Sequence, residues 1–294
     1  MNPNFAGIAA IIMWSISPLL IIGAGETPPF LMAFLILTFA SIILFFRLIA
    51  AKYSIKDIIF QPFAAYALTT YGIGGYVIFW FLGFKNAPAF EANTLNYLWP
   101  LLLVVFSHIV VKDKLTLLKI IGLLSGFAGT VLLFSQGKQI DIQGEFFWGY
   151  IFALIGAFIW ATYSTATRYV KFPNRAMAIF LLVPGLISLV IHLGTEEFYM
   201  PSKGEFFFIG LLGLTRISFV FWDYAMKYGQ IVFISSLSYF IPVISTALLM
   251  IFGNIPRNEI ILLSAALVIS GCLIINIKEI SSIVQNMKDR KNAI

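Results

Sequence analysis

The 294-residue chain is too hydrophobic for a soluble globular domain. Hydrophobic residues make up 60% of it, charged residues only 11%, and the mean hydropathy is +0.95, which leaves more apolar surface than a domain of this length can bury. The net charge of +6 is spread over short segments between apolar runs, so no nucleic-acid partner is expected. The lone cysteine, Cys272, excludes an internal disulfide and a cysteine zinc site. We therefore expect an integral membrane protein with lipid around it and with neither a metal nor a cofactor.

Polar and proline-rich interruptions divide the chain into ten apolar segments. Each is close to the roughly 20 residues that an α-helix needs to cross a bilayer. The linkers are short, so consecutive helices are expected to run antiparallel, and the predicted fold is an all-α bundle. The expected spans are 5–24, 30–49, 61–84, 89–111, 116–135, 147–170, 176–194, 204–226, 231–253 and 258–277.

The basic residues predict the orientation of the bundle. Of the 19 lysines and arginines, fourteen fall on the side that carries both termini, four fall on the other side, and Arg216 falls within a span. Basic residues gather on the cytoplasmic side of membrane proteins. We therefore expect both termini in the cytoplasm and the protein in the cytoplasmic (inner) membrane. The four on the opposite side are Lys85, Lys138, Lys203 and Arg257.

The two halves of the chain resemble each other. An offset of 142 residues superposes 95–100 on 237–242, and it also matches Trp80 with Trp222. We predict two repeats, residues 1–140 and 141–294. Each repeat has five spans, and because five is odd the second repeat enters the membrane in the opposite sense. Inverted repeats of this kind can alternate around a site near the bilayer midplane, so a central cavity is expected.

The fourth span carries the clearest polar cluster. Asn93, Asn96, Tyr97 and Trp99 precede Pro100 in an otherwise aliphatic segment, and a proline within a span frees a backbone carbonyl. A kinked helix that faces a cavity is predicted, with Asn96, Tyr97 and Trp99 as substrate-binding candidates. The alternative is that the polar groups bond only between helices.

Two further spans carry aromatic faces. In the sixth, Trp160, Tyr163, Ser164 and Thr167 recur at helical spacing, and in the third Tyr76 follows a glycine-rich stretch. Such a face can stack a flat ring and hold a polar group through its hydroxyls. Trp160, Tyr163 and Tyr76 are therefore substrate-binding candidates, with ordinary aromatic packing as the alternative.

One apolar span contains two opposite charges, Arg216 and Asp223. Seven residues place them on nearly the same helix face, and charge at membrane depth usually meets a partner, a cavity or a transport path. Arg216 is a candidate for a substrate carboxylate, and Asp223 is a proton-coupling candidate. Structural pairing with other spans is the alternative.

Several functions are disfavoured by missing motifs. The chain has no GxxxxGK[ST] phosphate loop and so no visible means of hydrolysing ATP, and no ATPase partner is evident. It has no hydrolase constellation, so it is not expected to be an enzyme. A secondary transporter of a small molecule is predicted. A membrane scaffold is the competing class.

The strings NYLWP at 96–100, IGAFIWA at 155–161 and SYFIPVIS at 238–245 resemble the drug/metabolite transporter superfamily with its EamA-type repeats, in particular the YddG-type aromatic amino-acid exporters. The resemblance implies a ten-helix basket with a central cavity that exports aromatic amino acids. It places Tyr97, Trp99 and Trp160 on the cavity wall, and Tyr76 by a weaker match. Tyr239 joins the site as the repeat counterpart of Tyr97. Transport of another metabolite, including uptake of an adenine-containing or cationic compound, remains open.

Overall fold

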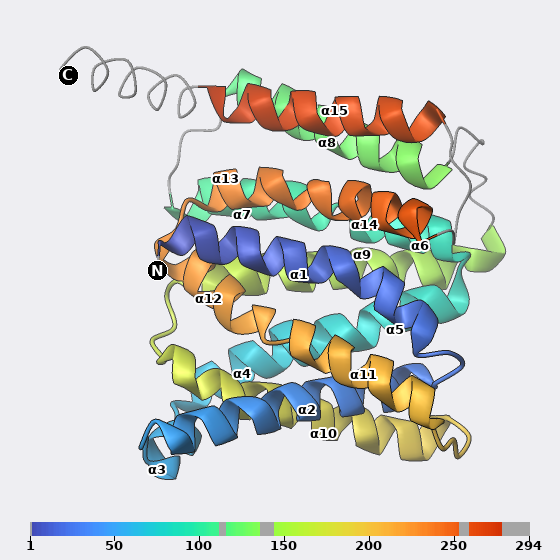
Figure 1. The fold of residues 1–294 in the computed structure, drawn as a ribbon. Coiled ribbons are helices and arrows are strands. Elements are labelled where there is room, and N and C mark those ends of the chain that lie inside the picture. The colour runs from blue at the N-terminus through green and yellow to red at the C-terminus, as the bar shows by residue number, and fades with distance from the viewer. Residues whose placement is uncertain (1, 112–115, 136–143, 253–258, 278–294) are drawn as a thin grey trace, which may run out of the picture.

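The computed structural model describes residues 2–111, 116–135, 144–252 and 259–277, and every regular element in these ranges is helical (Figure 1). Nine of the described helical segments are long and apolar enough to cross a membrane, and Glu259–Ile275 is a shorter apolar helix. They coincide with the ten predicted spans to within a few residues. The all-helical membrane fold is therefore confirmed.

Six spans are single helices, and a short helix, α3, follows the second of them. Proline lies at or near the start of both N-terminal spans, where its missing N–H costs no hydrogen bond. The single-helix spans are α1 (Pro3–Gly23), α2 (Pro29–Ala50), α8 (Leu117–Ser135), α9 (Phe147–Ala166), α10 (Met177–Thr195) and α15 (Glu259–Ile275), and α3 is Ile55–Ile59.

Four spans are interrupted near their middle. The third runs through a π-helical turn, as α4 (Phe63–Thr69), the π segment Thr70–Gly75 and α5 (Tyr76–Asn86). The fourth comprises α6 (Ala89–Asn96) and α7 (Trp99–Val111). The eighth comprises α11 (Lys203–Thr215) and α12 (Ser218–Tyr228), and the ninth comprises α13 (Ile231–Ser238) and α14 (Phe240–Ile251).

The interruptions recur at the offset seen in the sequence. Tyr97 ends α6 and Tyr239 ends α13, and these positions are 142 residues apart. The same offset carries Arg216, between α11 and α12, onto Gly74 in the π segment. Pro100 lies just beyond the first break, and its carbonyl accepts a hydrogen bond of 2.6 Å from Ser235 Oγ. The predicted proline-associated break is thus present, and a neighbouring helix donates a hydrogen bond to the backbone just beyond it.

Helices from the two halves pack against each other throughout the bundle. In Figure 1, α8 lies beside α15 at one edge and α2 lies beside α10 at the other, and between them α1 contacts α12 and α14 while α9 contacts α5 and α7. Each of these pairs joins a helix before residue 140 to one after residue 141. The N-terminus lies at the same end of the bundle as α3.

Glycine residues let α8 and α15 pack closely against each other. A Cβ atom added to Gly122 would lie 2.6 Å from the carbonyl oxygen of Gly271, and one added to Gly271 would lie 2.8 Å from the backbone nitrogen of Gly126. Backbone atoms cannot rotate away as a side chain can. Small residues at these positions therefore let the two backbones touch, as is common between membrane helices.

We expect Gly271→Val to destabilise the protein by about 1–3 kcal/mol, because the new side chain overpacks a backbone contact. The midpoint of thermal unfolding in detergent, followed by loss of the monodisperse peak, should fall by several degrees. Gly194→Val is the matched control, since a Cβ there meets no atom within 4 Å. Equal midpoints for the two variants would contradict this packing.

Candidate substrate-binding site

Four tryptophans from four helices meet at the centre of the bundle. Trp14 of α1 lies 4.9 Å from Trp222 of α12 and 5.7 Å from Trp160 of α9, measured between ring centroids. Trp160 and Trp222 are stacked at 6.0 Å, and Trp99 of α7 meets Trp222 edge-on at 5.6 Å. We call Trp14, Trp99, Trp160 and Trp222 the tryptophan cluster.

Predicted site residues surround this cluster. Tyr76 lies 5.1 Å and Tyr163 lies 5.4 Å from the Trp160 ring. Tyr163 packs flat against Gly72 in the π segment, where any side chain would collide with the tyrosine ring. Trp99 and Trp160 are only 4% and 3% exposed. In this conformation the rings close over one another.

Asn96 connects two elements of the site. Its Oδ1 accepts a hydrogen bond of 3.2 Å from the Tyr76 hydroxyl, and its Nδ2 donates one of 3.4 Å to the carbonyl of Ala153 in α9. Its side chain is 1% exposed. In this conformation Asn96 orients Tyr76 and joins α6 to α9, which matches the interhelical alternative; contact with a substrate stays a prediction.

The two tyrosines at the helix breaks have different surroundings. Tyr97 packs at the border of the hydrophobic core that contains the tryptophan cluster, and its ring lies 5.3 Å from Phe134 of α8. Tyr239 belongs to a second hydrophobic cluster, with Leu123 of α8 and Val268 of α15. The structure therefore brings Tyr97 to the site and places Tyr239 between α13 and the α8–α15 pair.

Arg216 lies at the break between α11 and α12, beside the cluster. Its Nη2 donates a hydrogen bond of 3.2 Å to Ser17 Oγ, three residues beyond Trp14 on α1. Its Nε is buried and has no hydrogen-bond acceptor, and among the described residues Arg216 forms no ion pair with a carboxylate. The Arg216 guanidinium thus lies at membrane depth without a carboxylate partner among the described residues, which costs free energy.

Asp223 has a different role from Arg216 in this structure. It is fully buried, its Oδ2 lies 2.9 Å from Lys227 Nζ, and its Oδ1 accepts a hydrogen bond from Thr167 of α9. Arg168, the next residue of that segment, donates to the carbonyls of Met226 and Gly229 at the end of α12, at 3.0 and 2.7 Å. We call Thr167, Arg168, Asp223 and Lys227 the α9–α12 lock. The structural alternative considered for Asp223 is therefore realised here, and proton coupling stays a prediction.

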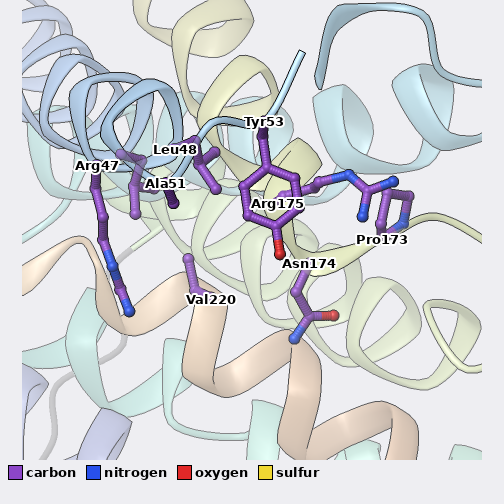
Figure 2. Close-up of a pocket in the computed structure, with 9 residues that line it drawn as sticks. Arg47, Leu48, Ala51, Tyr53, Pro173, Asn174, Arg175 and Val220 are labelled. Carbon is purple, nitrogen blue, oxygen red and sulfur yellow. The ribbon is translucent and has the colours of Figure 1, made fainter. Parts of the chain in front are cut away.

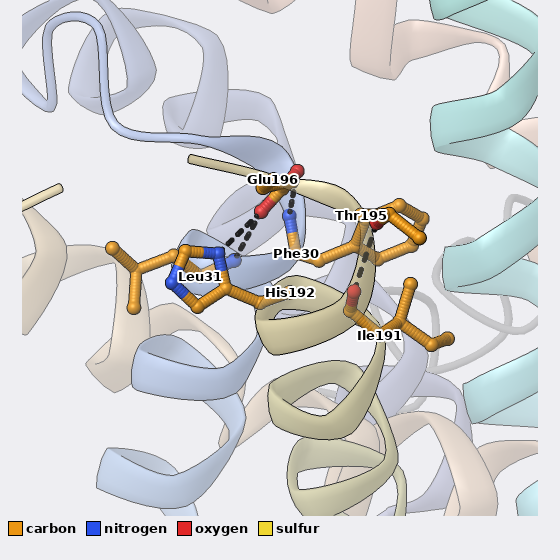
Figure 3. A network of polar contacts seen from close by, with 6 residues as sticks. All are labelled: Phe30, Leu31, Ile191, His192, Thr195 and Glu196. Atoms are coloured by element: carbon orange, nitrogen blue, oxygen red, sulfur yellow. Dashed lines mark hydrogen bonds and ion pairs between the residues drawn. The ribbon is translucent and has the colours of Figure 1, made fainter. Parts of the chain in front are cut away.

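The opposite end of the bundle is joined by a carboxylate on α10 (Figure 3). Glu196 accepts hydrogen bonds from the backbone N–H groups of Phe30 and Leu31, at 3.0 and 3.2 Å, and its Oε2 lies 2.8 Å from His192 Nδ1. Negative charge at a helix N-terminus is favourable. Glu196 thus fastens the end of α10 to the start of α2.

Some residues of the site were not predicted from the sequence. Trp222 and Phe219 of α12 lie within the aromatic centre, and Phe219 is 5.7 Å from Trp160. The signal for Trp222 was its repeat match with Trp80 and its position beside Asp223. Lys227 stands four residues after Asp223, the spacing of an ion pair on one helix face. It was nevertheless counted among the fourteen basic residues predicted on the cytoplasmic side.

Comparisons with known proteins agree with this architecture. The profile of the EamA-like transporter family matches twice, at residues 2–135 and 147–277. The chain belongs to this family of membrane transporters.

Individual relatives are similar over nearly the whole chain. A protein of Ancylobacter novellus named aromatic amino acid exporter YddG is 31% identical over 277 residues, 93% of this chain and 96% of that protein. A protein of the same name from Salmonella typhimurium is 26% identical over 91% of this chain and 94% of its own length. One solved crystal structure superposes with a TM-score of 0.88 at 31% identity, covering 94% of this chain and 97% of that one. The chain is therefore a multi-pass membrane transporter.

We expect Asp223→Asn to lower the free energy of unfolding by about 3 kcal/mol, because Lys227 would stay buried without its anion. The double variant Asp223→Asn/Lys227→Met removes both charges and should recover most of that loss. Thermal unfolding of the purified variants measures both effects. A single variant as stable as the wild type would show that the pair does not hold α12 in place.

Proposed function

We propose that the protein is a secondary transporter that exports aromatic amino acids by alternating access. In this proposal the tryptophan cluster holds the substrate's ring and Arg216 holds its carboxylate. The observation that carries the proposal is the Arg216 guanidinium, which lies at membrane depth beside aromatic rings without a carboxylate partner among the described residues. A bound amino acid would supply the missing anion.

The positions of the site residues support binding at a single place. Tyr76 contacts Trp160 and donates a hydrogen bond to Asn96, so residues predicted from three separate spans converge there. A scaffold has no need for such convergence. The YddG names of the relatives agree with an aromatic substrate.

The broken spans support movement around this site. Breaks at Tyr97, Tyr239 and Arg216, with the π segment near Gly74, give each half hinge points at corresponding depths. We propose that residues 1–140 and 141–294 act as the two moving units, with the termini in the cytoplasm of a cell whose inner membrane holds the protein. The α9–α12 lock fixes α9 to α12 within the second unit, and the tryptophan rings, which come from both units, must separate to admit substrate.

A flat adenine-containing solute is the second candidate, because the stacked Trp160 and Trp222 rings could hold a purine as well as a benzene or indole ring. A cationic solute is disfavoured by the charge of Arg216. A transport assay should therefore include both an adenine-containing and a cationic competing solute.

We expect Trp160→Ala to reduce the transport of phenylalanine into proteoliposomes about tenfold or more at low substrate concentration, since it removes the central stacking partner. Trp148→Ala is the matched control, because Trp148 is 64% exposed on the outer surface of α9. Labelled-substrate counterflow at equal reconstituted protein measures both. Equal loss in the two variants would contradict ring binding by the cluster.

We expect Arg216→Gln to remove the preference for phenylalanine over phenethylamine, which has the same ring without the carboxylate. A charge-assisted hydrogen bond contributes about 1.5–3 kcal/mol, or roughly ten- to a hundredfold in apparent affinity. Competition by each compound against labelled phenylalanine gives the ratio in wild type and variant. An unchanged ratio would show that Arg216 does not contact the carboxylate, even if transport declines.

A further inference from the structure

A cavity of about 520 Å³ lies away from the tryptophan cluster, between the end of α2, the turn before α10 and the side of α12 (Figure 2). Arg47, Tyr53, Asn174 and Arg175 contribute polar groups to its wall, and Leu48 and Val220 belong to its apolar part. Nothing in the proposed transport site uses these polar residues.

The wall of this cavity carries two positive charges and no carboxylate. Among the described residues, neither Arg47 nor Arg175 forms an ion pair, and Arg175 Nε is buried without a hydrogen-bond acceptor. The guanidinium of Arg175 lies 5.3 Å from the centre of the Tyr53 ring, a contact that holds the group in place without neutralising it. The cavity therefore has the charge of a site for an anion.

The depth of the cavity indicates the kind of anion. Arg47 is in the last turn of α2, which ends at Ala50, and Arg175 is in the turn that leads into α10. Both guanidinium groups therefore belong to span ends, where arginine and tyrosine meet lipid headgroups. Leu44, about one turn before Arg47 and farther from the end of α2, and Val220 of α12 add apolar side chains to the wall.

The neighbouring helix α3 supports a lipid interface at this place. It packs against the turn before α10, and Ile55 and Ile59 are 52% and 38% exposed, with Phe60 beyond them 78% exposed. A short segment with outward apolar groups beside a span end is typical of chain that lies at the membrane surface. A freely soluble anion would gain nothing from this apolar surround.

We propose that this cavity binds the headgroup of an anionic phospholipid, with its phosphate between Arg47 and Arg175 and with Asn174 and Tyr53 as neutral hydrogen-bond donors. Basic pockets at span ends bind anionic headgroups by the same chemistry. The lipid would join α2, α10 and α12, and so would bridge helices from both halves. This site is independent of the proposed substrate.

The test measures binding of phosphatidylglycerol by the full-length protein, delipidated in detergent, with native mass spectrometry and thermal stabilisation as readouts. We expect the double variant Arg47→Gln/Arg175→Gln to bind this lipid about tenfold or more weakly than the wild type. Phosphatidylcholine should bind both forms equally. The matched control is Lys85→Gln/Lys203→Gln, which removes the same charge from exposed positions predicted on the opposite side.

Four results would overturn the proposal. Equal weakening by the control pair would show non-specific attraction between charges. Stabilisation by free glycerol 3-phosphate as strong as that by the lipid, with the same dependence on the arginines, would indicate a soluble anion. Protection by phenylalanine that depends on Arg47 or Arg175 would identify the cavity as a vestibule for substrate. The single variant Arg47→Gln, at an exposed side chain, repeats the test if the double variant folds poorly, and undiminished lipid binding by it would also count against the proposal.

Discussion

The bilayer's inability to solvate polar groups is the constraint on which this structure depends. Polar groups within the interrupted spans need partners, and other helices provide several of them, as Ser235 does for the Pro100 carbonyl and Asn96 does for the Tyr76 hydroxyl. Asp223 follows the same rule through Lys227. Arg216 has no carboxylate partner among the described residues and donates to the hydroxyl of Ser17, so a substrate anion is expected beside it.

The family profile matches both halves of the chain, yet the two ends of the bundle are held by different interactions. The repeat offset of 142 carries Asp223 onto Phe81, which packs at 5.8 Å against Phe30 near the start of α2. One end of the bundle is therefore held by the ionic α9–α12 lock, and the other by aromatic contacts and the carboxylate of Glu196. Of these contacts, the one between Glu196 and the start of α2 joins residues 1–140 to residues 141–294, so it is the contact that movement between the two halves would break.

The sequence predicted the spans because apolar length is a local property, and it predicted the break before Pro100 because proline removes a backbone donor. Spacing and resemblance also selected Trp160, Trp99 and Tyr76, which the structure brings into one aromatic centre, and their contact with a substrate stays a prediction. The sequence could not show that Tyr239 and Tyr97 have different surroundings, because corresponding positions in the two halves contact different neighbours. The Asp223–Lys227 pair was not predicted because it depends on where the span ends. The Arg47–Arg175 cavity was not predicted because it depends on how separate segments meet. Composition alone does not contain that information.

The most direct test of the central claim is counterflow of labelled phenylalanine by the purified wild-type protein in liposomes, with tryptophan, phenethylamine and adenosine as competing solutes. The account predicts saturable phenylalanine flux that tryptophan inhibits strongly and that phenethylamine and adenosine inhibit weakly. Flux of adenosine or of a cationic solute without any phenylalanine flux would contradict it, because the same cluster and the same arginine would then serve a different ligand.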